Sequence, residues 1–375
     1  MAQFPIPASL QKSIETTKVD YVRLGSSGLR VSSPILGAMS LGSTQWMPWV
    51  LDEEKSLEIL KAAYDRGINT WDTANAYSNG ISEEVIGKAL RKFSIPREKI
   101  IILTKCFLHV GEEPSIFTAP FGEALNQTKD YVNQGGKRVA AGDRRHPVNH
   151  RAGLSRASIF NSVEASLKRL GTDYIDLYQI HRFDPTTPIE ETMKALHDLV
   201  QAGKVRYIGA SSMWATQFAR MQTVAELNGW TKFVSMQNYY HLCYREEERE
   251  MNRYCKDTGV GIIPYSPNFG GKLARPLGQD DSTRAKTPGP ISSDLRPDEE
   301  EIIRRVEKLA VEKGWKMSNV NLAWHHTKGT VPIVGFNSIA RIDEACDARG
   351  KTLTAEEVKF LEEPYVPKPI FGLFD

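Results

Sequence analysis

Four side chains that can hold or transfer protons stand where short apolar runs of the sequence stop. Asp72, Lys105 and His181 each follow directly on such a run, and Tyr77 comes shortly after Asp72. Short apolar runs of this kind are typical of buried strands. If these strands are parallel members of one barrel, their carboxyl ends share a face, and the four side chains converge in a single pocket.

The chemistry of this set is specific. A buried lysine is tolerable only when it is paired, and Asp72 can supply the counter-charge to Lys105. An ammonium group close to a phenol stabilises the phenolate, so Tyr77, whose free pKa is about 10, becomes a better proton donor and acceptor near neutral pH. A neutral His181 can hydrogen-bond a substrate oxygen. Read singly, these residues are a loop charge, a capping carboxylate and a structural histidine; their joint placement favours a site.

Other catalytic machinery is poorly supported. The chain contains no Gly-x-Ser-x-Gly nucleophile elbow, no Walker phosphate loop and no zinc-protease motif, and His146 and His150 stand beside Pro147 in an irregular stretch. No metal site is expected. An acid without a metal or a nucleophile implies a cofactor that carries the harder step. Residues that suit an amide, an aromatic ring or a phosphate follow the later strands, namely Ser211, Ser212, Gln237, Tyr265, Ser266, Gly335, Asn337 and Arg341.

Eight apolar runs, each followed sooner or later by a helical pattern, must position these residues. Strict alternation of this kind predicts an α/β fold, a (β/α)8 TIM barrel with parallel strands. A doubly wound open sheet is the alternative, and the absence of Gly-x-Gly-x-x-Gly after the first strand argues against it. The expected strands cover residues 34–38, 68–72, 100–104, 175–180, 205–210, 233–237, 260–264 and 331–335.

The chain is expected to form a single barrel domain over residues 21–375, preceded by an N-terminal extension, residues 1–20. A Gly/Ser turn at residues 25–28 between alternating apolar residues predicts an N-terminal β-hairpin. The loops that follow the strands are long. The segment 108–153 is rich in Gly, Pro, Asn and charge, without sustained periodicity, and is interpreted as a loop insertion that shapes specificity.

Composition excludes several classes of partner. With 375 residues, 41% hydrophobic and 25% charged, the chain is typical of a globular protein. A net charge of +2 gives no global field that would favour nucleic acid or an anionic membrane. No signal peptide or spanning segment is expected, and four cysteines without a Cys-x-x-Cys pair suit a reducing, cytoplasmic setting. The oligomeric state stays open.

Four long motifs carry a resemblance to a known family. They are Arg23-Leu-Gly-x-Ser-Gly-Leu-Arg-Val-Ser32, Trp71-Asp-Thr-Ala-x-x-Tyr77, Leu167-x-Arg-Leu-Gly-Thr-Asp-Tyr-Ile-Asp-Leu-Tyr-Gln-Ile-His181 and Gly203-Lys-Val-Arg-Tyr-Ile-Gly-Ala-Ser-Ser212. Over residues 21–363 the sequence resembles the aldo-keto reductases, which are NADPH-dependent barrel enzymes. Within them it is most similar to the aryl-alcohol dehydrogenase-like group and to fungal reductases of the versiconal hemiacetal acetate reductase type.

The resemblance implies roles for the residues. Tyr77 would be the general acid that protonates the carbonyl oxygen, Lys105 and Asp72 would tune it, and His181 would orient the substrate. The implied NADPH contacts are Ser211, Ser212 and Gln237 at the carboxamide, Tyr265 on the ring, Ser266 through Gly271 at the diphosphate, and Asn337 and Arg341 at the 2'-phosphate. Ser212, Gly335 and Ala345 replace Asn, Lys and Asn of many relatives, which weakens the expected NADPH preference, whereas Arg341 supports it.

The resemblance also implies a substrate class. The expected reaction is NADPH-dependent reduction of an aromatic or polycyclic aldehyde or ketone to the alcohol, in secondary metabolism. The candidate substrate pocket comprises Trp46, Trp49, Phe107 and Phe183. The alternatives are an NADPH-binding, redox-sensing regulatory subunit, against which the complete set of four residues argues, and a metal-assisted hydrolase in the same barrel.

Overall fold

Eight parallel strands form one sheet at the centre of the molecule. The computed structural model describes residues 6–118, 153–279, 282–287 and 294–372. The strand order is β10-β3-β4-β5-β6-β7-β8-β9, with every neighbouring pair parallel. The strands are β3 (Ile35–Gly37), β4 (Thr70–Asp72), β5 (Ile101–Cys106), β6 (Ile175–Ile180), β7 (Val205–Ser211), β8 (Phe233–Gln237), β9 (Gly261–Ile262) and β10 (Ile333–Gly335).

Backbone hydrogen bonds also join the two end strands. The amide of Val331 donates to the carbonyl of Ile262 at 2.9 Å, and the amide of Ile333 donates to the carbonyl of Pro264 at 2.9 Å. The last strand therefore lies beside the first and the seventh strand of the barrel, and the expected (β/α)8 barrel is confirmed. β9 and β10 are shorter than predicted because Pro264 and Pro332 lack the amide hydrogen that a longer ladder needs.

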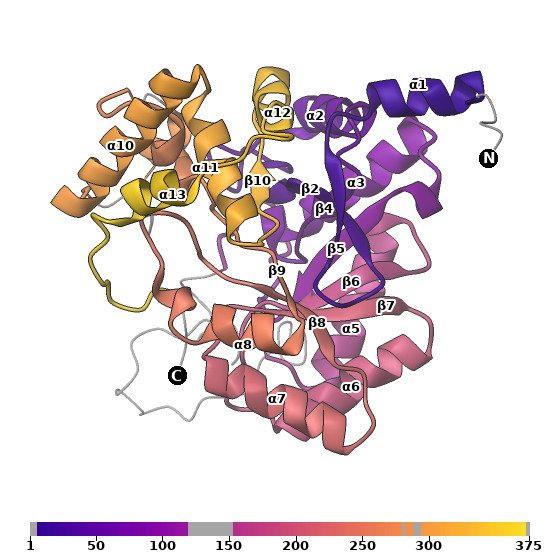
Figure 1. Ribbon diagram of the computed structural model, residues 1–375. Coiled ribbons are helices and arrows are strands. Elements are labelled where there is room, and N and C mark those ends of the chain that lie inside the picture. The colour runs from indigo at the N-terminus through magenta and orange to yellow at the C-terminus, as the bar shows by residue number, and fades with distance from the viewer. Residues whose placement is uncertain (1–5, 119–152, 280–281, 288–293, 373–375) are drawn as a thin grey trace, which may run out of the picture.

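Helices surround the strands, and Figure 1 shows that they pack along the outside of the sheet. Within the described ranges, no helix is both long and apolar enough to cross a bilayer. Most of the predicted loop insertion 108–153 lies outside the described residues. The helices are α1 (Ala8–Thr16), α2 (Glu53–Asp65), α3 (Ile81–Lys92), α5 (Arg156–Leu170), α6 (Ile189–Gln201), α7 (Ala215–Leu227), α8 (Met251–Thr258), α9 (Thr283–Lys286), α10 (Pro297–Lys313), α11 (Met317–Thr327), α12 (Ile339–Cys346) and α13 (Ala355–Glu362).

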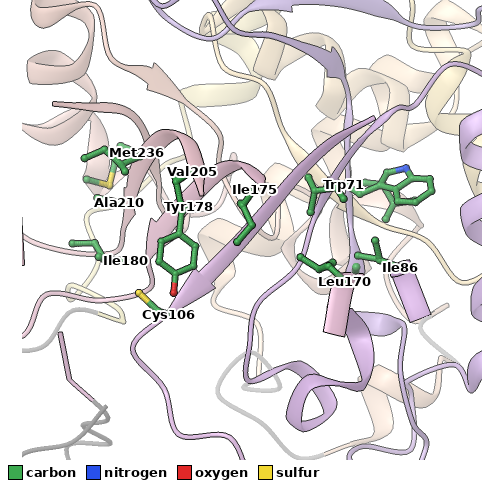
Figure 2. Packing of buried hydrophobic residues seen from close by; sticks show 14 of the residues in the cluster. Trp71, Ile86, Cys106, Leu170, Ile175, Tyr178, Ile180, Val205, Ala210 and Met236 are labelled. Atoms are coloured by element: carbon green, nitrogen blue, oxygen red, sulfur yellow. The ribbon is translucent and has the colours of Figure 1, made fainter. Parts of the chain in front are cut away.

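The strands bury both of their faces, as a barrel requires. Successive side chains of a strand point to opposite sides. One set, which includes Trp71, Tyr178 and Ile180, packs outward against helices in the main core, whose packing is shown in Figure 2. The other set, which includes Leu103 and Leu177, fills the inside of the barrel. This inner layer supports the polar residues that lie nearer the carboxyl ends of the strands.

The predicted N-terminal hairpin is present and closes the opposite end of the barrel. Its strands are β1 (Asp20–Arg23) and β2 (Arg30–Ser33), paired antiparallel. Leu24 and Leu29, at the turn, pack with the inner layer of the barrel. The hairpin therefore excludes water from the amino-terminal end and leaves the other end open for a site. Helix α1, which precedes it, buries none of its side chains.

Candidate active site

Two-residue periodicity places the predicted lysine and histidine inside the barrel. Leu103 of β5 points into the inner layer, so Lys105, two residues later, points inward and nearer the carboxyl end. Leu177 of β6 leads in the same way to Gln179 and then to His181. The register pairs Lys105 with Gln179 across β5 and β6. These side chains therefore lie in one layer above the apolar interior.

Lys105 and Asp72 form a buried ion pair. The lysine Nζ lies 2.5 Å from Asp72 Oδ2, and the two side chains are 0% and 3% exposed. The same Nζ also donates to the carbonyl of Thr73 at 2.9 Å and approaches the Tyr77 hydroxyl at 3.5 Å. All three hydrogens of the ammonium group thus have an acceptor. The predicted pairing is present, and it aims the lysine at the phenol.

The second carboxylate oxygen of Asp72 accepts two amides. Gln179 donates to Asp72 Oδ1 at 2.9 Å, and Gln237 donates to the same oxygen at 3.0 Å. Gln237 also donates to Gln179 Oε1 at 3.1 Å. A buried carboxylate that accepts three hydrogen bonds, two at one oxygen and one at the other, is held in one orientation. Gln237, expected at the cofactor carboxamide, therefore also braces Asp72.

Tyr77 lies in a tight turn after β4, and its hydroxyl points toward Lys105. It begins a short 3-10 segment, Tyr77–Gly80, in which Ser78 and Asn79 adopt left-handed backbone angles, with φ of 48° and 52°. Its ring centre lies 5.9 Å from that of His181, with the planes nearly perpendicular. The structure thus brings together all four residues that the sequence predicted, from β4, β5, β6 and the turn.

The electrostatic environment separates the roles of these groups. Burial raises the pKa of Tyr77, and Lys105 lowers it by a smaller amount, so the net shift is upward. Burial disfavours the charge on Lys105, but Asp72 and Tyr77 outweigh it and raise the lysine pKa. The expected effect of the ammonium group on the phenol is present, but it does not prevail. Tyr77 therefore holds its proton at neutral pH, as a proton donor must.

His181 is neutral. Burial, together with the positive charges of Arg182 and Lys105, holds the pKa of His181 well below its usual range. Its Nδ1 atom is buried and has no hydrogen-bond partner among the described residues. A neutral imidazole next to a phenol can orient a polar group of a ligand.

The residues expected at the carboxamide lie at the ends of β7 and β8. The Ser211 hydroxyl donates to the carbonyl of Gln237 at 2.7 Å, and the Ser212 amide donates to Asn238 Oδ1 at 3.1 Å. Asn238 in turn donates from its Nδ2 to buried Glu247 at 2.5 Å. Ser212 has a left-handed φ of 44°. Hydrogen bonds to Gln237 and Asn238 hold this turn in place, with its two serine hydroxyls at the carboxyl end of β7.

The segment expected near the diphosphate has an unusual backbone. Tyr265, half-buried, pairs with Tyr239 at a ring distance of 5.5 Å. Ser266 and Gly271, after it, have φ of 53° and 107°. A side chain at Gly271 would meet the Arg275 guanidinium at 2.9 Å. An aromatic ring followed by a tightly turned, glycine-containing backbone fits a dinucleotide, because backbone amides can approach phosphate closely there.

The residues expected at the 2'-phosphate lie at the end of β10 and the start of α12. Gly335 and Asn337 are exposed. Arg341 lies in the first turn of α12, where its guanidinium pairs with Glu344 at 2.9 Å. Arg341 and Asn337 are thus at the surface, close to a helix start that favours an anion. The set as a whole follows the carboxyl ends of β7 to β10 and fits an extended dinucleotide.

Aromatic rings cover Tyr77 on the side of the first loop. The ring centre of Trp46 lies 6.4 Å from that of Tyr77 and 6.4 Å from that of Trp49. Phe117 adds a third ring, 5.9 Å from Trp46. Trp46 therefore lies beside the phenol, and Trp49 lies beside Trp46. Phe107 and Phe183, the other two predicted pocket residues, pack in the main core.

Sequence reasoning missed three residues of this region. Gln179 carried a usable signal, because it is a polar residue at an inward position of an apolar strand. Phe117 lies in the long irregular stretch, where no periodicity indicates orientation. Arg284, whose guanidinium carbon lies 4.6 Å from the ring centre of Trp49, also belongs to an irregular stretch.

Comparisons with known proteins agree with this geometry. The model of the Aldo/keto reductase family matches residues 35–365. An aldo-keto reductase of Fusarium vanettenii is 56% identical over 374 residues, covering 98% of this chain and 96% of the relative. The versiconal hemiacetal acetate reductase of Aspergillus parasiticus is 49% identical over 357 residues, 94% of this chain and 98% of the relative. A Schizosaccharomyces pombe protein named as an aryl-alcohol dehydrogenase is 47% identical over 356 residues, 94% of this chain and 97% of the relative. The chain belongs to the aldo/keto reductase family.

Proposed function

We propose that this enzyme reduces an aldehyde or ketone to the alcohol with NADPH, and that Tyr77 is the proton donor. One observation carries the proposal: the Tyr77 hydroxyl lies 3.5 Å from Lys105 Nζ at the open end of the barrel, with the neutral His181 ring beside it. A reduction needs a proton at the carbonyl oxygen and a hydride at the carbon. The described side chains supply the first of these.

The protein would act by positioning and by proton transfer. NADPH, when bound, supplies the hydride. His181, with an unpartnered Nδ1, would orient the carbonyl group toward the Tyr77 hydroxyl. As the hydroxyl gives up its proton, the phenolate that forms is stabilised by the Lys105 ammonium, which Asp72 holds in place. The ammonium group stabilises the phenolate more than the neutral phenol, so this stabilisation develops as the proton is transferred.

NADPH rather than NADH is proposed because Arg341 lies at the start of α12 near Asn337. Arginine is suited to phosphate, since its planar guanidinium can donate two parallel hydrogen bonds. Arg341 would have to exchange its pairing with Glu344 for the 2'-phosphate. An aromatic or polycyclic substrate is proposed from the rings of Trp46 and Trp49 and from the names of the relatives. A role in secondary metabolism is proposed from the same names. A cytoplasmic location is proposed from the cysteine pattern of the sequence.

The proposal is tested with purified enzyme, aromatic aldehydes and both cofactors. We expect consumption of NADPH with an equal amount of alcohol formed, and a lower kcat/KM for NADH. Arg341→Leu should reduce the preference for NADPH, while Lys308→Leu, an exposed change on α10, should leave it unaltered. Binding of NADPH without turnover of any carbonyl compound would contradict the enzyme and favour the regulatory alternative.

A further inference from the structure

The turn that carries Tyr77 is hydrogen-bonded to two loops that come from different strands. The next two residues of the turn, Ser78 and Asn79, both have left-handed backbone angles, with φ of 48° and 52°. The Ser78 hydroxyl accepts a hydrogen bond at 3.2 Å from the amide of Ser43, in the loop after β3. The Asn79 side chain is hydrogen-bonded to the loop after β5. The residues that directly follow the proposed proton donor therefore determine where these two loops lie.

Asn79 forms three hydrogen bonds with the backbone of residues 111–116. Its Nδ2 atom donates to the carbonyls of Glu113 and Ile116 at 2.8 and 2.6 Å, and its Oδ1 atom accepts from the amide of Gly111 at 2.8 Å. Both N–H bonds of the side-chain amide, and its oxygen, are thus used by one short segment. Asparagine tolerates left-handed backbone angles better than most residues, so this residue type suits both the turn and the contact.

The segment fits closely around the asparagine side chain. A Cβ at Gly111 would lie 2.9 Å from Asn79 Nδ2 and 3.1 Å from Ile116 Cβ. A larger residue at position 111 would therefore have to displace the Asn79 amide. The Thr118 hydroxyl also donates to the carbonyl of His109 at 3.2 Å, which joins the two ends of the segment. These contacts hold residues 109–118 in one position relative to the Tyr77 turn.

This segment places Phe117 next to Trp46. The two ring centres lie 5.9 Å apart, and the ring centre of Trp46 lies 6.4 Å from that of Tyr77. Trp46 is buried, with 9% of its surface exposed, whereas Phe117 is 38% exposed. A partly exposed aromatic ring beside a buried one can pack against a flat, apolar ligand. Phe117 is therefore an aromatic contact that lies one ring further from Tyr77 than Trp46 does.

We propose that Asn79 is a positioning residue for substrate specificity: it holds Phe117 beside Trp46, so that the enzyme prefers aromatic carbonyl compounds with a second ring. This inference rests on the proposed function. The carbonyl group would lie at the Tyr77 hydroxyl, the first ring against Trp46 and the second ring against Phe117. Because Asn79 and Tyr77 belong to the same turn, one short piece of chain fixes the spacing between the proton donor and the outer ring.

Two other roles for Asn79 predict different results. An asparagine that only stabilises the fold would affect thermal unfolding, and the folded variant would keep the wild-type choice between substrates. An asparagine that only positions Tyr77 would change the reduction of every carbonyl compound by the same factor. A role through Phe117 changes the choice between a one-ring and a two-ring substrate.

The test compares benzaldehyde with 4-phenylbenzaldehyde, which presents the same aldehyde with one ring more. We expect the wild type to have the higher kcat/KM for the two-ring compound, through a lower KM. Asn79→Gly keeps the left-handed backbone accessible and removes the three hydrogen bonds. It should lower the two-ring to one-ring ratio of kcat/KM by about 3- to 10-fold. Asn79→Asp, which cannot donate to the two carbonyls, should lower the ratio as well. Asn228→Gly, an exposed change at the end of α7, should leave it unaltered.

Removal of the Phe117 ring gives an independent arm of the test. Phe117→Ala should lower the same ratio by the same factor as Asn79→Gly. In the double variant the ratio should fall no further, because the two residues act through one contact. The NADPH Kd, measured by isothermal titration calorimetry, should match the wild type in all of these variants.

The outcomes separate this inference from the proposed function. A wild-type ratio of one or less, an unchanged ratio in Phe117→Ala, or equal losses for both aldehydes in Asn79→Gly and Asn79→Asp would overturn the role of Asn79 while the reductase activity stands. Additive losses in the double variant would also overturn it. Failure of the wild type to oxidise NADPH with either aldehyde would contradict the proposed function itself.

Discussion

The charge on Lys105 is kept inside the barrel by partners that are in place before any ligand binds. Its three hydrogens reach Asp72, Thr73 and Tyr77, and the other oxygen of Asp72 accepts two glutamine amides. A buried ion pair that is fully hydrogen-bonded contributes orientation, whereas loss of one partner leaves an uncompensated charge. The same residues that permit the ammonium group inside the barrel therefore also aim it at the phenol.

At the level of single residues, the pH dependence of catalysis should lack a histidine. Because the pKa of His181 is held well below its usual range, its ring is neutral throughout the range of about pH 5 to 8 in which histidines normally titrate. The plot of kcat/KM against pH should be flat there. Tyr77, with a raised pKa, should lose its proton only above about pH 10. An inflection near pH 6.5 that disappears in His181→Gln would contradict this reading.

Glu247 gives a prediction about stability. Burial raises the pKa of Glu247 from 4.5 to about 7, and its hydrogen bond from Asn238 only partly opposes this. Between these two values the folded protein binds a proton that the unfolded chain has lost, so the free energy of unfolding falls as pH rises. The loss approaches about 3 kcal/mol above pH 7.

Glu247→Gln should lack this loss. Urea denaturation at pH 5 and pH 8 should show the variant gaining stability relative to the wild type at the higher pH. Glu312→Gln, an exposed change on α10, should show no such gain. If the difference in free energy of unfolding between Glu247→Gln and the wild type is the same at both pH values, the raised pKa is wrong.

For single residues, the sequence predicts a side chain's position where the two-residue periodicity of a strand determines its direction. Asp72, Lys105 and His181 stand at strand ends, where the direction of each side chain follows from its apolar neighbours. Arg284 and Phe117 lie in irregular stretches, where contacts with distant rings determine their position. The sequence did not predict that the pKa of Tyr77 is raised. Burial outweighs the effect of Lys105, and the extent of burial depends on the assembled barrel.

Among the elements, the N-terminal hairpin covers the end of the barrel that lies away from the candidate site. Gly25 in its turn has φ of 58°, and a Cβ there would meet the carbonyl oxygen of Gly259 at 2.2 Å. Gly28 has an ordinary φ, and a Cβ there would lie 3.6 Å from the Tyr207 hydroxyl. The turn therefore fits against the loop before β9 only when Gly25 lacks a side chain.

Gly25→Ala should destabilise the protein by at least about 1–3 kcal/mol, the range for a strained backbone conformation. Gly28→Ala should change stability by less than about 1 kcal/mol. Thermal unfolding measures both. At temperatures where both variants are folded, kcat should equal that of the wild type, since the hairpin is remote from Tyr77. A Gly25→Ala variant as stable as Gly28→Ala would show that the close approach to Gly259 is not maintained.

The sequence predicted the elements better than their limits. All eight strands lie where apolar runs indicated them, but β3, β4 and β10 keep three residues each and β9 keeps two. Pro264 and Pro332 interrupt the ladder at β9 and β10, while backbone bonds from Val331 and Ile333 still join these two strands. Helix α1 was not predicted within the extension 1–20; it buries no side chain, so no core contact fixed its pattern.

For the molecule as a whole, the residues that stabilise the barrel and the residues of the candidate site lie at opposite ends of its interior. Apolar residues and the hairpin fill the amino-terminal half of its interior, while Asp72, Lys105, Gln179 and Gln237 occupy the layer above. Loops after β3, β4 and β9 then bring the tryptophans, Tyr77 and Arg284 to the opening. Strict alternation of strands and helices was enough to predict this architecture. The positions of the loops depend on contacts that have no periodic signature.

Hydride transfer in Tyr77→Phe tests the convergence of the four side chains most directly. In a single turnover with saturating NADPH and an aromatic aldehyde, removal of the proton donor should slow NADPH oxidation by at least about 100-fold. The NADPH Kd should stay within about 3-fold of the wild type, because the loss affects a group that acts in the transition state. Hydride transfer at the wild-type rate in Tyr77→Phe would contradict the assignment of the phenol as the acid.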